Sequence, residues 1–197
     1  MNHIHKTVAI LGLAAVLGGG AISVQAQTPQ PILITQNAED LFSQGLEKME
    51  KGDFKGAIDD FSKSLEIKPN NAETFYYRGL AQDLLEENDK ALEDYSEAIR
   101  LAPENTYAYN NRGTVYAELK EYQKAIQDYD RALQIDVDNA NAYYNRGLAN
   151  SALGNPQSAL TDFQKAADLY KKQGKTQDYE DAMNRLTELQ KPQPQGR

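Results

Sequence analysis

Residues 106–139 read TYAYNNRGTVYAELKEYQKAIQDYDRALQIDVDN, and this stretch decides the fold of the chain. In its first half, Tyr109, Gly113 and Tyr116 stand at i, i+4 and i+7, which is the spacing of residues on one face of an α-helix. Its second half repeats that spacing with a tyrosine between two alanines. We therefore predict two short helices that approach closely at the small residues, with the aromatic rings filling the space between them.

The same pattern recurs every 34 residues. Four columns share this register: Gly45, Gly79, Gly113 and Gly147; Ala57, Ala91, Ala125 and Ala159; Asp60, Asp94, Asp128 and Asp162; and Phe61, Tyr95, Tyr129 and Phe163. Four columns in one register exclude coincidence and indicate a repeat architecture. The register predicts four helix–turn–helix units over 38–71, 72–105, 106–139 and 140–173, with Gly and Pro residues marking several of the expected turns and ends.

These columns resemble the pattern of the tetratricopeptide repeat (TPR) family, which is a large apolar residue, Gly or Ala, an aromatic, then Ala, an aromatic and Ala, and a closing Pro. The middle aromatic is present only as Tyr116, and Val137 and Lys171 replace the closing Pro in the last two units. The departures concern helix ends and local packing rather than the fold. The resemblance, to the exported bacterial type, implies an all-α, right-handed superhelix of four helix pairs plus a C-terminal capping helix.

The segment after the fourth unit has the features of that cap. Residues 174–190 contain an apolar stripe at helical spacing, with charged residues between its members. The stripe consists of Tyr179, Ala182, Met183, Leu186 and Leu189. Stacked repeats leave an apolar face at the end of the stack, and a helix with one polar side can cover it. Residues 27–37 are interpreted as a linker and 191–197 as a disordered tail.

Residues 1–26 have the layout of a secretory signal peptide, with Lys6 ahead of an uncharged, mostly apolar stretch and small residues at −3 and −1 of a cut after Ala26. We predict export to the periplasm or the thylakoid lumen, with cleavage near Ala26 and no membrane insertion after cleavage. The alternative is an uncleaved N-terminal membrane anchor, although the apolar run is near the lower length limit for a span.

The composition excludes most catalytic chemistry. The 197 residues contain no Cys, and both histidines, His3 and His5, precede the predicted cleavage point. A Ser-His-Asp triad, a Cys nucleophile and a zinc site with N/S ligands therefore could not form after cleavage. The calcium-loop-like stretch 136–141 lacks the Gly and Glu that such a loop needs. We expect no enzyme activity, no metal and no cofactor.

The first helix of each unit is expected to pack one stripe inside the unit, which leaves a flanking stripe to line the superhelix interior. The resemblance implies that this stripe binds peptides. The predicted peptide-binding groove consists of Tyr76, Tyr77, Leu80, Tyr107, Asn110, Asn111, Thr114, Tyr144, Asn145 and Leu148. Asn111 and Asn145 stand where peptide-binding TPRs often hold a ligand backbone amide, and tyrosines offer stiff contact area with a polar tip. The alternative is that the tyrosines are only packing aromatics.

The groove lacks the Lys and Arg residues with which some TPRs clamp a C-terminal carboxylate. The aligned positions hold Glu39, Phe42, Glu73, Tyr76, Tyr107 and Asn111. A carboxylate needs charge-assisted donors, so such a clamp is not expected and a neutral to basic protein or peptide is the better partner. The net charge of −8 and the absence of long basic clusters argue against nucleic acid as a partner.

Arginines also recur, directly before three of the repeat glycines. Arg78, Arg112 and Arg146 are interpreted, with Asp60, Asp94, Asp128 and Asp162, as a ladder of structural ion pairs rather than as anion ligands, because partly buried charges are usually paired. Pairing within units leaves Asp60 single, and pairing between neighbouring units leaves Asp162 single. The pattern does not decide between these two arrangements.

The repeat and the composition together predict a non-enzymatic scaffold or adaptor that binds a peptide segment of a partner in its concave groove. The family resemblance implies assembly or regulation of an envelope or photosynthetic-membrane complex. The alternative is a structural module that associates with copies of itself, and an amphipathic capping helix would block end-to-end growth of that kind.

Overall fold

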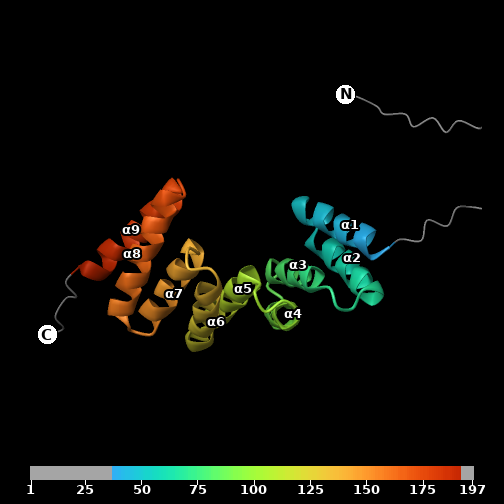
Figure 1. The fold of residues 1–197 in the computed structure, drawn as a ribbon, viewed down its shortest axis with the longest axis horizontal. Coiled ribbons are helices and arrows are strands. Elements are labelled where there is room, and N and C mark those ends of the chain that lie inside the picture. Colours follow the sequence, from blue (N-terminus) through green and yellow to red (C-terminus); the bar gives the residue numbers. More distant parts are fainter. Residues whose placement is uncertain (1–36, 192–197) are drawn as a thin grey trace, which may run out of the picture. The chain divides into compact units, whose positions relative to one another are not determined.

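The computed structural model describes residues 37–191, which form nine α-helices and no strand (Figure 1). The helices are α1 (Ala38–Glu50), α2 (Phe54–Ile67), α3 (Ala72–Asp83), α4 (Asn88–Leu101), α5 (Thr106–Glu118), α6 (Tyr122–Ile135), α7 (Ala140–Ala152), α8 (Pro156–Lys172) and α9 (Thr176–Gln190). The predicted signal peptide, nearly all of the predicted linker and residues 192–197 of the predicted tail lie outside the described residues. Within 37–191, no helix has the length and apolar character that crossing a membrane requires.

The residue directly before each unit is an asparagine that caps the unit's first helix. Asn37, Asn71, Asn105 and Asn139 form a further column at the 34-residue interval. Each side-chain Oδ1 accepts a hydrogen bond from the backbone N–H three residues later, at 2.9–3.1 Å. The first N–H groups of a helix have no partner inside the helix, so this bond stabilises the start by about 1 kcal/mol.

The turn inside each unit contains one residue with left-handed backbone. Gly52 and Gly154 have φ values of +77°, and Glu86 and Lys120 occupy the same repeat position with φ values of 59° and 62°. The N–H of the following residue closes a hydrogen bond to the carbonyl five residues earlier, at 2.8–2.9 Å in all four turns. This bond holds the turn even where a side chain must adopt a conformation that favours glycine by about 1 kcal/mol.

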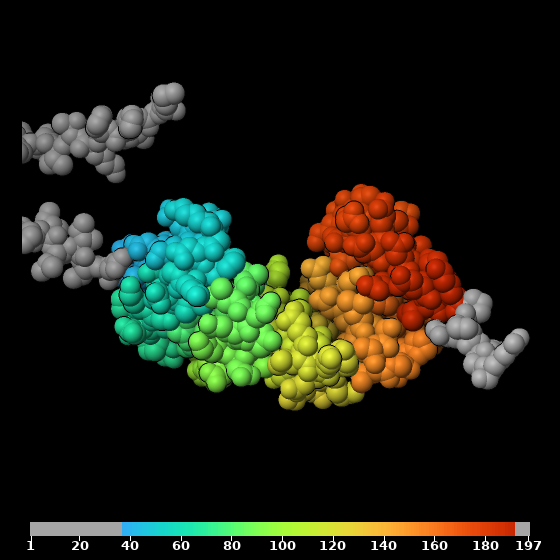
Figure 2. All heavy atoms as spheres, turned by 180° about the vertical axis from the view of Figure 1, so that it is seen from behind, coloured from blue at the N-terminus to red at the C-terminus, as the bar shows by residue number. Residues whose placement is uncertain are grey.

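Consecutive helices contact each other from α1 through to α9, and the first helices α1, α3, α5 and α7 also contact one another in that order. Contacts between first helices indicate that they line the inner, more tightly curved side of the stack. Figure 1 shows α3, α5 and α7 along one side with α4 and α6 along the other, and Figure 2 shows the surface hollowed between the α1–α2 and α8–α9 ends. The predicted all-α TPR-type solenoid is confirmed.

The glycine and aromatic columns recur together because they touch. A Cβ atom at Gly113 would lie 2.8 Å from Cε1 of Tyr129, so the ring of the second helix packs directly on the backbone of the first. The four rings of this column are fully buried, at 0–1% exposure. Alanines at 0% exposure complete the contact in every unit. The core is therefore a row of small clusters, one beside the next, rather than a single centre.

Both ends of the stack present polar surfaces. α1 has the exposed Asp40 at the position where later units bury Thr or Ala against the preceding unit. Glu47 of the same helix forms an exposed ion pair with Lys51, the residue that follows the helix. At the other end, α9 packs on α8 through Ala182 and Leu186 and leaves its charged residues outside. Among residues 37–191, the outward sides of α1 and α9 are therefore largely polar.

Candidate functional site

The predicted groove residues lie on α3, α5 and α7, on the inner side of the stack, and do not form one uniform surface. We call the following predicted residues the groove face: Tyr76, Tyr77, Leu80, Tyr107, Asn110, Asn111, Thr114, Tyr144, Asn145 and Leu148. Only Tyr107, at 70% exposure, and Leu148, at 36%, are exposed, and the others are partly buried. Contacts divide the groove face into one group between α3 and α5 and a second group on α7.

The group between α3 and α5 is built around Tyr76. Its ring packs against Tyr77 at a centroid distance of 5.1 Å and against the buried Tyr95 at 6.0 Å. The side-chain amide of Asn111 donates a hydrogen bond to the Tyr76 hydroxyl at 3.3 Å. Burial raises the pKa of Tyr76, and the neighbouring Tyr77 and Tyr107 add to that effect. Tyr76 and Tyr77 thus pack against neighbouring rings and are also partly exposed. A role in packing therefore does not exclude a role in binding a peptide.

The α7 group is tied to the C-terminal end of the stack. The Tyr144 ring packs against Phe163 at 5.6 Å and against Tyr170 at 6.4 Å. Asn145 is partly buried and Leu148 exposed beside it on the same helix. In the neighbouring α5, Thr114 donates to the Asn110 carbonyl and accepts a hydrogen bond from Tyr129, so its hydroxyl is already engaged. The side-chain oxygen of Asn110 is buried and has no hydrogen-bond partner among the described residues.

A carboxyl group that the sequence pattern did not indicate lies at the end of α3. Asp83 is partly buried and accepts a hydrogen bond from the Tyr95 hydroxyl at 3.2 Å. Burial, together with the charge of Glu118 at the end of α5, raises the pKa of Asp83 from its ordinary value to about 6. The only available signal was helical spacing, since Asp83 follows Tyr76 and Leu80 at i+7 and i+3.

We expect Asp83→Asn to raise the free energy of unfolding at pH 7.5 by about 1 kcal/mol, after allowance for solvent screening. The folded-state pKa is raised, so this carboxyl stabilises the fold only when protonated, and its contribution is lost as the pH rises through about 6. The amide keeps an acceptor for Tyr95 without the charge. Urea unfolding at pH 7.5 and pH 5 checks the result: the gain should shrink at pH 5, and a loss of stability at pH 7.5 would contradict the prediction.

The predicted arginine–aspartate ladder is present, and its pairs form within units. The guanidinium groups of Arg78, Arg112 and Arg146 each donate two hydrogen bonds, at 2.6–3.0 Å, to the aspartate 16 residues later. Each guanidinium also lies over the aromatic ring three residues before it, at 5.4–5.8 Å from the centroid. The aspartates are buried, so these are low-dielectric, bidentate pairs that hold the two helices of a unit together.

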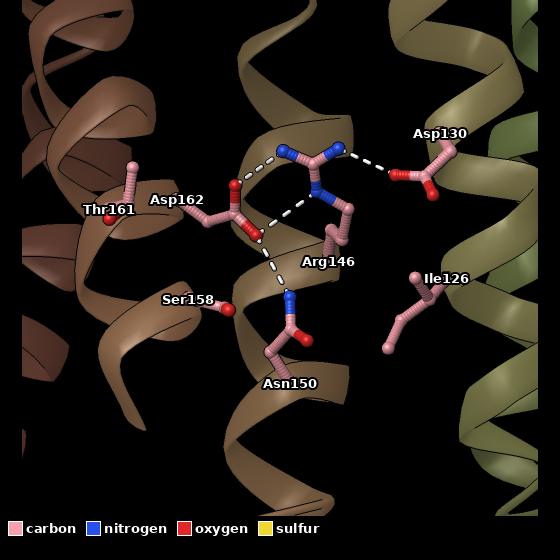
Figure 3. A pocket seen from close by; sticks show the side chains of 7 residues that line it. All are labelled: Ile126, Asp130, Arg146, Asn150, Ser158, Thr161 and Asp162. Atoms are coloured by element: carbon pink, nitrogen blue, oxygen red, sulfur yellow. Dashed lines mark hydrogen bonds and ion pairs between the residues drawn. The ribbon is translucent and has the colours of Figure 1, made fainter. Parts of the chain in front are cut away.

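Each arginine also reaches the preceding unit, which the sequence interpretation missed. The third nitrogen of each guanidinium donates to Ser62, Ser96 or Asp130, at 2.6–3.1 Å. These three residues are again 34 apart, which was the signal available in the sequence. Figure 3 shows Arg146 between Asp162 of α8 and Asp130 of α6. The ladder therefore joins neighbouring units as well as the helices within one.

Asp60 has a cationic partner of its own. The first unit has Gln44 where later units have Arg, and Lys48 stands at the family's middle aromatic position. The Lys48 ammonium lies 2.6 Å from Asp60, whose side chain is 6% exposed. The departure from the family pattern at Lys48 thus neutralises the one ladder carboxylate that lacks an arginine.

A pocket of about 360 Å³ opens beside Arg146 and Asp162, the ladder pair of the fourth unit (Figure 3). Its lining consists of Ile126, Asp130, Arg146, Asn150, Ser158, Thr161 and Asp162. Asp162 accepts hydrogen bonds from both Arg146 and Asn150, so the charge at its centre is already neutralised. Within the described part of the chain, no group of His, Cys, Asp and Glu side chains is arranged to hold a metal ion.

Comparisons with known proteins agree with this architecture. A family model described as "TPR repeat" matches residues 45–83, 84–120 and 114–154, and one described as "Tetratricopeptide repeat" matches 140–173. Comparison with curated protein sequences gives no match.

Several solved structures are similar to this chain. A crystal structure of MamA is 30% identical, with a TM-score of 0.68 over 71% of this chain and 81% of that one. The first TPR of Spaghetti (RPAP3), bound to the HSP90 peptide SRMEEVD, is 28% identical, with a TM-score of 0.59 over 60% of this chain and 94% of that one. The Arabidopsis OM64 TPR domain is 34% identical, with a TM-score of 0.55 over 61% and 94%.

The family models cover more than half of the chain, and their matches run through all four helix pairs built on the glycine, alanine and aromatic columns. The chain belongs to the tetratricopeptide repeat family.

Proposed function

We propose that this protein is a non-enzymatic scaffold or adaptor that holds a peptide segment of a partner protein against the groove face. The observation that carries the proposal is that Tyr107 of α5 is 70% exposed and lies beside Tyr76 and Asn111, whose partly buried side chains are joined by a hydrogen bond. Large exposed aromatic residues with polar neighbours are typical of protein-binding surfaces. The peptide-bound RPAP3 structure supports this use of the fold.

The partner segment is proposed to be neutral to basic. The RPAP3 peptide ends in Glu-Glu-Val-Asp, and an acidic terminus of that kind needs cationic donors. In this chain the positions of a carboxylate clamp hold Glu39 and Glu73 together with aromatic and amide residues. Lys68 lies against the Glu39 carboxylate, which lowers the pKa of Glu39, so this cation is already paired.

We further propose that the protein acts after export, in the periplasm or the thylakoid lumen, in the assembly or regulation of an envelope or photosynthetic-membrane complex. The layout of residues 1–26 supports export, and the family resemblance supports the role. Self-association by end-to-end stacking is the competing function, and the polar faces of α1 and α9 disfavour it.

Photocrosslinking from the groove face tests the proposed function. We expect p-benzoylphenylalanine at position 107 to give discrete covalent adducts with a partner protein in the exported fraction, because the exposed Tyr107 side chain would lie in the contact. The matched control carries the same group at Gln127, which is exposed on α6, a second helix. Adduct masses measured by mass spectrometry distinguish the outcomes. Equal adducts from both positions, or none from position 107, would reject the groove face as the binding surface.

A further inference from the structure

The pocket beside Arg146 and Asp162 lies where the preceding unit has a tyrosine side chain. Its lining residue Asn150 is the counterpart of Tyr116, which stands 34 residues earlier at the middle aromatic position of the family pattern. The Tyr116 ring packs against a buried cluster that contains Tyr129. Asparagine has a much smaller side chain than tyrosine, so the fourth unit lacks the volume of a ring at this position. The pocket of about 360 Å³ opens there.

The mouth of the pocket differs from the third unit in the same direction. In the third unit, Lys124 of α6 extends over the Tyr116 ring, and its ammonium lies 5.1 Å from the ring centroid. The counterpart of Lys124 in α8 is Ser158, a short and exposed residue that lines the pocket. The ring and the cation above it thus both have smaller counterparts in the fourth unit, and space opens between the helices.

The buried end of the pocket offers a hydrogen-bond acceptor. Asp162 and Asn150 are both buried, and the Asn150 amide donates to the Asp162 carboxylate at 3.1 Å. This bond fixes the orientation of the amide and leaves its Oδ1 turned away from Asp162 (Figure 3). Among residues 37–191, no donor forms a hydrogen bond to that oxygen. A ligand that enters the pocket therefore meets an acceptor, which favours a group with an O–H or N–H donor.

The charges around the pocket disfavour an ionic ligand. Asp130 and Asp162 both pair with Arg146, so the lining carries one more negative than positive charge. An acidic group would be repelled by this excess, and a cation would lie beside the guanidinium of Arg146. A neutral ring can pack against Ile126 without separating these pairs, and a hydroxyl at its end can donate to Asn150. Tyrosine has both features.

We propose that this pocket binds one tyrosine side chain of a partner protein. The ring takes the place that Tyr116 occupies in the third unit, and the phenol hydroxyl donates to Oδ1 of Asn150. The pocket is formed by α6, α7 and α8, and none of its lining residues belongs to the groove face. The site is therefore a second interaction surface, and it does not depend on the proposed function.

The test titrates the full chain with N-acetyl-L-tyrosinamide and follows the protein by NMR. We expect saturable shifts of the Asn150 side-chain amide and of the Arg146 Nε–H signal in the millimolar range. N-acetyl-L-phenylalaninamide lacks the hydroxyl and should bind at least threefold more weakly, because the Asn150 acceptor then gains no donor. The corresponding amides of lysine and glutamate should produce no saturable shift at these signals.

Three variants locate the bound ring. Asn150→Tyr fills the pocket from within the chain, as Tyr116 does in the third unit, and should bind N-acetyl-L-tyrosinamide at least tenfold more weakly than wild type. Gln177→Tyr adds the same residue at an exposed position of α9 and should bind like wild type. Ser158→Lys restores the cation that covers the ring in the third unit and should bind about threefold more tightly.

Each other outcome would overturn the tyrosine site. These outcomes are no saturable shift in wild type, unchanged binding by Asn150→Tyr, unchanged or weaker binding by Ser158→Lys, and tighter binding of the lysine amide than of the tyrosine amide. Circular dichroism shows whether each variant is folded, and Ser158→Lys alters only an exposed residue, so it decides the question even where Asn150→Tyr does not fold. Failure of this test leaves the groove face in place, because the crosslinking test at position 107 is separate.

Discussion

Replacing Arg112 with leucine is expected to lower the free energy of unfolding by about 3–5 kcal/mol, which is a fall in Tm of roughly 10 °C for a chain of this size. The substitution removes both hydrogen bonds to Asp128, at 2.7 and 2.8 Å, and the bond to Ser96 in the preceding unit. The Asp128 side chain is 8% exposed and would keep a buried charge without a partner. This loss exceeds anything the added leucine can contribute by burial.

Two variants isolate the cause of that loss. Arg131→Leu removes an exposed arginine from α6 and should change stability by less than about 0.5 kcal/mol. The double variant Arg112→Leu/Asp128→Leu removes both charges and should recover much of the lost stability, because a buried ion pair often contributes little net energy over apolar packing. Urea unfolding followed by circular dichroism measures all three. If Arg112→Leu abolished peptide binding while leaving the unfolding midpoint unchanged, the arginines would be ligand residues instead.

The fold could be predicted from sequence because its strongest constraint repeats. The contact between Gly113 and the Tyr129 ring recurs in every unit, so the same two columns appear four times. The hydrogen bond from each ladder arginine to the preceding unit was harder to predict. Its acceptor is Ser in two units and Asp in the third. Because the residue type in this column varies, its contact with the arginine becomes apparent only from the positions of the helices.

The candidate site was predictable only in part, for two physical reasons. Helical spacing places a residue on one face of a helix but does not give the exposed fraction of its side chain. The sequence therefore could not distinguish Tyr76, which packs on Tyr95, from Tyr107, which is 70% exposed. Asp83 occurs in one unit only, so no column marks it. Its significance depends on its partial burial and on the charge of Glu118, which lies 35 residues away in the chain.

The same distinction between buried and exposed tyrosines gives the second large effect. Tyr129→Ala is expected to lower the free energy of unfolding by about 3–5 kcal/mol. The Tyr129 ring is 1% exposed, packs against Gly113 and belongs to a cluster with Ala125 and Ala149, and its hydroxyl donates to Thr114. Truncation leaves a cavity in the third unit. Each unit is stabilised by its neighbours, so a weakened third unit should also broaden the unfolding transition.

Tyr107→Ala provides the matched control, because it makes the same chemical change in the same unit at 70% exposure. It should alter the free energy of unfolding by less than about 0.5 kcal/mol, since the side chain buries little in the folded chain. Under the proposed function, the same substitution should weaken peptide binding, whereas Tyr129→Ala should act through stability alone. Calorimetry and peptide affinity, measured on both variants below the unfolding transition, give the two readouts. A destabilised Tyr107→Ala protein would assign Tyr107 to packing and remove the most exposed tyrosine from the groove face.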